Sequence, residues 1–223
     1  AYEIVFGEWS SDVCSSYLFA PVAAREAPRP TLPRRTAPLL APRTDRPGVF
    51  PGEPFAVEET PGRTRAGGPP CRAWAAHAGG VLMVRIEIPL EKPLTADPEP
   101  VWTKTDGAEV CFAYPDENAR HPTFVLHGFP NGTVRSSTEA GAPDAAAAAL
   151  LRQVTFKAEV GDGRWTAEWH IPLAAVDIPG RPGLELHFNL GVFRAESKQW
   201  IQWAGTQGQT WRVRDAGRIR LAE

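Results

Sequence analysis

The residues of this 223-residue chain that could do chemistry are tryptophans set among polar side chains. Trp102 stands four residues before Asp106, Trp200 two before Gln202, and Trp211 follows a loop of glycine, glutamine and threonine. A pyranose has an apolar C–H face and a belt of hydroxyls, so an indole can stack on the face while polar groups bond the belt. These tryptophans therefore predict a saccharide site. The alternative is that they cap the ends of a folded domain.

A second chemistry would use carboxylates. Asp106, Glu109 and Glu168 are the candidates for a pair that cleaves a glycosidic bond. However, the hairpin register described below places Glu168 opposite Lys157, and a cross-strand charge pair explains it equally well. The sequence also lacks the nucleophile-elbow, phosphate-loop and zinc-protease motifs. We therefore rank a glycoside hydrolase below a binding domain.

Metal and thiol chemistry is only weakly indicated. The five histidines are His77, His121, His127, His170 and His187. They are scattered over expected strands and loop edges, so we expect surface residues rather than metal ligands. With three cysteines and no C-x-x-C, no zinc site is predicted. Cys71 and Cys111 are a candidate disulfide if the protein is exported.

Composition excludes some functions. Lys plus Arg number 24 and Asp plus Glu 26, which gives a formal charge of −2. Such a balance argues against a nucleic-acid partner, because it gives no long-range attraction for phosphates. The sequence has no apolar run near the ~20 residues of a membrane-spanning helix, so we also expect no membrane partner.

The first 70 residues differ from the rest. Residues 8–18 resemble the conceptual translation of a sequencing adapter, so we expect residues 1–20 to be a non-native artefact and the true N-terminus to be missing. Residues 21–70 are rich in proline and arginine, which predicts a linker or disordered segment. The folded domain is expected at 71–223.

The elements that must position the tryptophans are β-strands. Alternating apolar residues and turn signals predict an all-β fold, an antiparallel β-sandwich of about nine strands with one short helix at 143–152. The strands are expected at 72–78, 81–88, 107–114, 123–129, 133–138, 184–194, 198–204 and 217–222 and in the hairpin 154–171. Trp74, Trp165 and Trp169 are expected in the core.

The hairpin 154–171 has the best-specified register. Its two-residue Asp162-Gly163 turn pairs residues whose numbers sum to 325. Phe156 then faces Trp169, and all the apolar groups share one side. A slip of one residue would move them all to the other face.

Three segments together resemble family-9 carbohydrate-binding modules and the related DOMON-like β-sandwiches, over residues 71–223. The first is 102–112 (WTKTDGAEVCF), the second 163–173 (GRWTAEWHIPL) and the third 188–194 (FNLGVFR), followed by Trp200 and the closing GRIRL of 217–221.

The resemblance implies a non-catalytic module that binds glucan or xylan and belongs to a larger, extracellular or periplasmic polysaccharide-degrading protein. In the family a sugar is held between two tryptophan rings. That role falls on Trp102 and Trp200, with Trp211 as the substitute, and the polar partners would be Asp106, Asn189, Arg194 and Gln202.

The resemblance also bears on cofactors and partners. It allows a structural calcium ion, for which Asp116-Glu117-Asn118 is the one acidic turn near a strand end. A haem is not expected, since Met83 is the sole methionine and lies within an expected strand. The remaining alternative is a structural sandwich that docks another domain through an apolar patch around Trp200 and Trp211.

Overall fold

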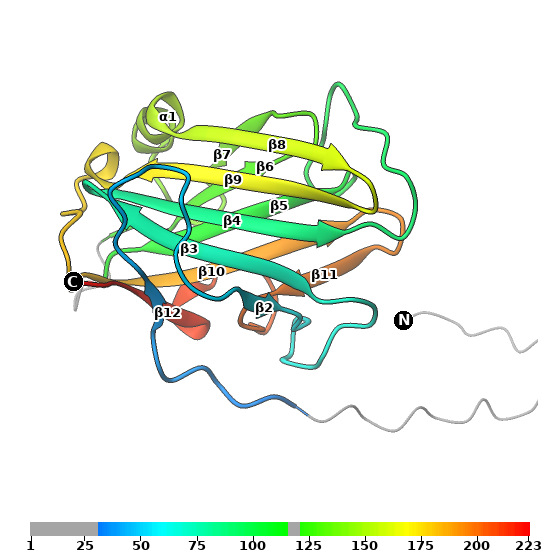
Figure 1. Cartoon of the computed structure of the whole chain (residues 1–223), viewed down its shortest axis with the longest axis horizontal. Coiled ribbons are helices and arrows are strands. Elements are labelled where there is room, and N and C mark those ends of the chain that lie inside the picture. Colours follow the sequence, from blue (N-terminus) through cyan, green and yellow to red (C-terminus); the bar gives the residue numbers. More distant parts are fainter. Residues whose placement is uncertain (1–30, 116–120) are drawn as a thin grey trace, which may run out of the picture.

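The computed structural model describes residues 31–115 and 121–223, which fold into two β-sheets packed face to face (Figure 1). One sheet has seven strands in the order β1-β12-β10-β5-β6-β7, with β11 also pairing with β10, and the other has five in the order β2-β3-β4-β9-β8. The strands are β1 (Leu39–Ala41), β2 (Phe55–Val57), β3 (Cys71–Ala78), β4 (Val81–Pro89), β5 (Gly107–Ala113), β6 (Phe124–Gly128), β7 (Val134–Ser137), β8 (Thr155–Gly161), β9 (Arg164–Pro172), β10 (Glu185–Arg194), β11 (Gln199–Gln202) and β12 (Gly217–Leu221). The helix α1 (Asp144–Gln153) packs at one end of the two sheets. The described residues also form two short 3-10 helices, η1 (Leu173–Val176) and η2 (Val213–Asp215).

The predicted all-β sandwich with one short helix is confirmed, and each expected strand segment contains a strand. Apolar residues alternate along the strands as expected, and the inward-facing side chains of both sheets form one core. The β8–β9 hairpin has the predicted register, with Phe156 paired to Trp169 and Lys157 to Glu168. The carboxylate of Glu168, however, contacts His170, with 2.7 Å between Oε1 and Nε2.

The predicted linker is wrong for part of residues 31–70, which contribute a strand to each sheet. β1 pairs in parallel with β12, and β2 pairs antiparallel with β3. Both are apolar triplets at sheet edges, where nearby prolines are tolerated because one side of the strand needs no hydrogen bonds. The proline-rich composition hid these short strands. The adapter-like residues 8–18, and all of 1–30, lie outside the described residues.

Trp74 is not in the core, contrary to expectation. Its neighbours Ala73 and Ala75 point inward, so Trp74 lies on the outer face of the five-stranded sheet. The guanidinium carbons of Arg72 and Arg85 lie 5.3 and 5.9 Å from its ring centre. This half-buried tryptophan is far from the cavity described below, because that cavity belongs to the other sheet.

The candidate disulfide between Cys71 and Cys111 is not formed. Cys71 and Cys111 are both buried and unpaired, Cys71 in the five-stranded sheet and Cys111 in the seven-stranded one. Burial raises the pKa of the Cys71 thiol to about 11. Within the described ranges, none of the helices combines the length and apolar character needed to cross a bilayer.

Candidate functional site

The site is built on the outer face of the seven-stranded sheet. Gln202, Gly191, Glu109 and His127 are successive cross-strand partners on β11, β10, β5 and β6. Residues that face one another on adjacent strands project to the same side. The row therefore places the Glu109 carboxylate and the His127 ring side by side on this face.

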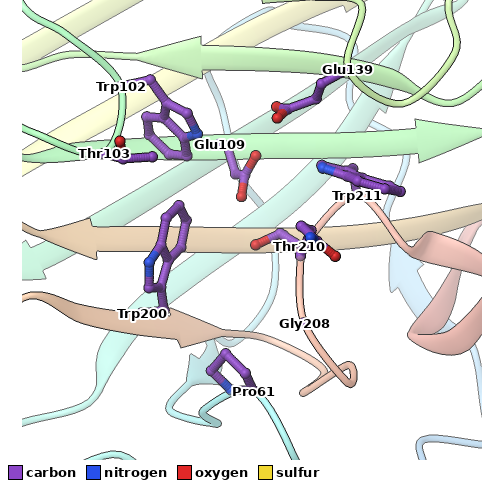
Figure 2. A pocket seen from close by; sticks show the side chains of 10 residues that line it. Pro61, Trp102, Thr103, Glu109, Glu139, Trp200, Gly208, Thr210 and Trp211 are labelled. Atoms are coloured by element: carbon purple, nitrogen blue, oxygen red, sulfur yellow. The ribbon is translucent and has the colours of Figure 1, made fainter. Parts of the chain in front are cut away.

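A cavity of about 330 Å³ lies over this face, and the three tryptophans predicted from the sequence all line it. Figure 2 shows Trp102 and Trp200 on one side of the cavity and Trp211 on the other, with the Glu109 and Glu139 carboxylates between them. The other lining residues are Pro61, Thr103, Gly208, Gln209 and Thr210. The cavity thus combines apolar aromatic faces with two hydrogen-bond acceptors.

Trp102 is held by a tight turn and by the absence of a side chain beneath it. The amides of Lys104 and Thr105 both donate to the carbonyl of Val101, at 3.0 Å each. A Cβ at Gly107 would lie 2.8 Å from the Trp102 ring, so this position needs glycine for the indole to rest on β5. The ring stacks on His127, with centroids 4.0 Å apart and planes 12° from parallel.

The expected sugar clamp between Trp102 and Trp200 is wrong. Their ring centroids are 5.4 Å apart and their planes meet at 76°, so the two indoles touch edge to face. A sugar ring between them would need about 7–8 Å, twice the contact distance of carbon atoms. Trp211, named as the substitute ring, is the indole that faces the other two across the cavity. Its ring nitrogen is buried without a hydrogen-bond partner.

Gln202 and Asn189 do not line the cavity and instead hold the loop that leads to Trp211. Gln202 is fully buried. Its amide nitrogen donates to the Gly208 carbonyl at 3.0 Å, and its amide oxygen accepts from the Thr206 amide at 2.8 Å. The side-chain amide of Asn189, also fully buried, donates to the carbonyls of Ala204 (3.0 Å) and Thr210 (3.1 Å). Both were predicted as ligand-binding residues, and the structure makes them positioning residues.

Asp106 and Arg194 also lie outside the aromatic cavity and line a second one of about 120 Å³. The Asp106 carboxylate accepts from the Ala195 amide at 3.1 Å, which ties the Trp102 loop to the end of β10. Arg194 is buried and donates to the Pro69 carbonyl at 3.2 Å. The sequence therefore found three residues of the cavity and four that support or flank it.

The carboxylate trio proposed for hydrolysis is not assembled. Glu109 projects from the outer face of the seven-stranded sheet, whereas Glu168 is on β9 of the other sheet. Asp106 lies at the second cavity. The calcium candidate, residues 116–118, lies outside the described residues.

The sequence missed Glu139, which lines the cavity with Glu109, and His127, which lies close to both carboxylates and stacks on Trp102. His127 Nε2 lies 3.5 Å from Glu109 Oε2 and 3.4 Å from Glu139 Oε1. His127 is buried, contrary to the expectation that every histidine is at the surface, and so is His77. Burial lowers the pKa of His127, but the two carboxylates outweigh it and raise the pKa above its ordinary value. The neighbouring His127 in turn lowers the pKa of Glu139.

No protein-family model matches this sequence, and no curated protein matches it. Solved structures do resemble the fold. A carbohydrate binding module family 9 structure from Caldicellulosiruptor kristjanssonii in complex with cellotriose has a TM-score of 0.60 at 14% identity, covering 83% of this chain and 94% of that one. A structure of a family-9 module from the same organism in complex with glucose has a TM-score of 0.59 at 15% identity, covering 82% and 95%.

A third structure, a candidate carbohydrate-binding protein from Bacteroides uniformis, has a TM-score of 0.56 at 12% identity, covering 82% of this chain and 98% of that one. The chain thus has the β-sandwich fold of carbohydrate binding module family 9, as its sequence motifs implied.

Proposed function

We propose that this chain is a non-catalytic carbohydrate-binding module. The observation that carries the proposal is the gathering of three indole rings around one cavity that also contains two carboxylates. Solved structures of the same fold in complex with cellotriose and glucose support it.

The chemistry of the cavity suits a pyranose. The indole faces offer apolar surface for a sugar's C–H face, and the carboxylates of Glu109 and Glu139 accept hydrogen bonds from hydroxyls. The buried nitrogen of Trp211 has no partner among the described residues, and a hydroxyl oxygen would satisfy it. Because Trp102 and Trp200 contact each other, they form one wall and Trp211 the other.

The size of the cavity favours a short ligand. A volume of about 330 Å³ is near the lower end of the ~300–1,000 Å³ of small-molecule sites. We therefore propose that it takes the end of a glucan or xylan chain. The module would serve an extracellular or periplasmic polysaccharide-degrading protein, with other domains of that protein as its partners.

Titration with cello- and xylo-oligosaccharides, followed by tryptophan fluorescence and calorimetry, tests the proposal. Trp211→Ala should weaken binding by roughly tenfold, equivalent to ~1.4 kcal/mol, because one wall of the cavity is lost. Trp74→Ala is the matched control, since Trp74 is half-buried on the other sheet and should leave affinity unchanged. Absence of any signal at millimolar sugar with both series would refute carbohydrate binding of this type.

A docking sandwich is the less favoured function. It would need a broad and flat apolar patch, whereas Trp200 and Trp211 line a cavity that also contains the buried carboxylate of Glu109. A hydrolase is likewise disfavoured, because Glu168 lies on the other sheet from Glu109.

A further inference from the structure

One cluster at the cavity combines two carboxylates that line it with a buried histidine close to both. It consists of Glu109, His127 and Glu139, each of which offers a ligand atom within 4.8 Å of the other two. His127 is 5% exposed, and its Nε2 atom has no hydrogen-bond partner. This nitrogen points between the two carboxylates, at 3.5 Å from Glu109 Oε2 and 3.4 Å from Glu139 Oε1.

These two separations are long for hydrogen bonds, whose N···O distances are about 2.7–3.2 Å. They match the spacing of ligands around a shared ion. Nitrogen and oxygen atoms bound about 2.0–2.1 Å from a tetrahedral zinc ion lie roughly 3.3–3.4 Å from each other. The ligand atoms of the two carboxylates lie within 4.8 Å of each other, and the Glu139 side chain is 40% exposed and has room to turn.

The negative charge of the two carboxylates also favours a bound cation. Glu109 is 2% exposed, and a buried carboxylate is unfavourable unless a positive charge or several hydrogen bonds compensate it. Among residues 31–115 and 121–223, the ion pairs give neither Glu109 nor Glu139 a lysine or arginine partner. The Cys111 thiol approaches Glu109 at 3.7 Å, and burial together with that carboxylate raises the Cys111 pKa, so it remains a neutral donor.

We propose that Glu109, His127 and Glu139 bind a divalent transition-metal ion, and that zinc is the ion this donor set fits. One imidazole and two carboxylates are ordinary zinc ligands. Calcium takes six to eight oxygen ligands and does not favour imidazole, so it suits this cluster poorly. Three protein ligands leave an open position, and since both carboxylates line the cavity, that position faces it. The ion would also fix the ring on which Trp102 stacks.

The test is zinc binding by the tag-free, metal-stripped chain, measured by calorimetry and by metal analysis after dialysis. We expect one zinc per chain and, with Co²⁺ in its place, visible bands of a four-coordinate site. His127→Gln should weaken zinc binding by at least ~100-fold, more than loss of an outer hydrogen-bonding residue does. His170→Gln is the matched control, because His170 contacts a single carboxylate, that of Glu168.

Glu139→Gln provides a second variant whose folding is not at risk, because Glu139 is at the surface. It should also weaken zinc binding, with an unchanged circular dichroism spectrum. Wild-type chain that takes up no zinc at micromolar concentration, or that binds calcium in preference, would overturn the proposal. So would His127→Gln and Glu139→Gln variants that bind zinc as tightly as the wild type. None of these outcomes depends on whether the cavity binds sugar.

Discussion

Replacing Gln202 by leucine would separate two roles for a polar residue near the aromatic cavity, ligand contact and support of a loop. The Gln202 side chain makes four hydrogen bonds within the interior. Its nitrogen donates to the Gly208 carbonyl (3.0 Å) and the Thr210 hydroxyl (3.2 Å). Its oxygen accepts from the Thr206 amide (2.8 Å) and hydroxyl (3.3 Å). All these partners lie in the loop that ends at Trp211.

The size of the effect follows from what leucine leaves behind. The two hydroxyls can rotate to other partners, but the Thr206 amide and the Gly208 carbonyl would lose theirs. Each orphaned backbone group lowers stability by about 1–3 kcal/mol, so we expect a loss near 3 kcal/mol after leucine's apolar contacts are counted. For a domain of this size, each 1 kcal/mol shifts the melting temperature by about 2–4 °C, so Tm should fall by roughly 6–12 °C.

Thermal unfolding followed by circular dichroism measures this, with Gln207→Leu as the control. Gln207 is on the same loop but exposed, so the same substitution there should change stability by less than ~0.5 kcal/mol. Sugar affinity of Gln202→Leu should also fall, because Trp211 is less well placed. If Gln202→Leu melts within about 1 °C of the wild type yet loses sugar affinity, the residue contacts the ligand and our reasoning is refuted.

Three further predictions concern other parts of the chain. Gly107→Ala should displace Trp102, because the new Cβ would lie 2.8 Å from its ring. Sugar affinity measured by titration should fall several-fold, and an unchanged affinity would contradict this packing. Burial and two nearby arginines lower the pKa of His187 from 6.5, so the unfolded chain takes up this proton more readily. The stability of the wild type relative to His187→Asn should therefore decline as pH falls below 6.5; equal pH profiles would refute this. Thiol labelling at pH 8 with peptide mapping should be slow at Cys71 and Cys111 until the protein is denatured, since burial raises both pKa values.

The strand pattern could be predicted wherever one face is buried and the turn is short. The hairpin of β8 and β9 is the clearest case, because a two-residue turn leaves only one register that keeps Phe156 and Trp169 on the same side. The edge strands β1 and β2 were not found. Three-residue strands carry too little alternation to stand out from a proline-rich background.

The acidic cluster could not be predicted for a different reason. Glu109 and His127 are cross-strand partners on β5 and β6, but ten residues separate these strands. A connection of that length does not fix the register, so the sequence gives no sign that the two side chains meet. Glu139 is even harder to predict, because it lies in the loop between β7 and α1, whose sequence has no hydrophobic periodicity.

Asn189 and Gln202 show the limit of alternation as a guide to binding residues. Asn189 lies two residues before Gly191 on β10 and therefore projects to the same outer face, where a polar side chain is typical of a ligand-binding residue. Residues 204–210 then fold back over that face and use both amides as hydrogen-bond partners. A side-chain amide offers the same donors and acceptor to a sugar as to a covering loop. The sequence pattern therefore does not distinguish the two roles. The tryptophans were better guides: Trp102 and Trp211 lie in loops beside this face, and Trp200, on β11, lines the cavity itself.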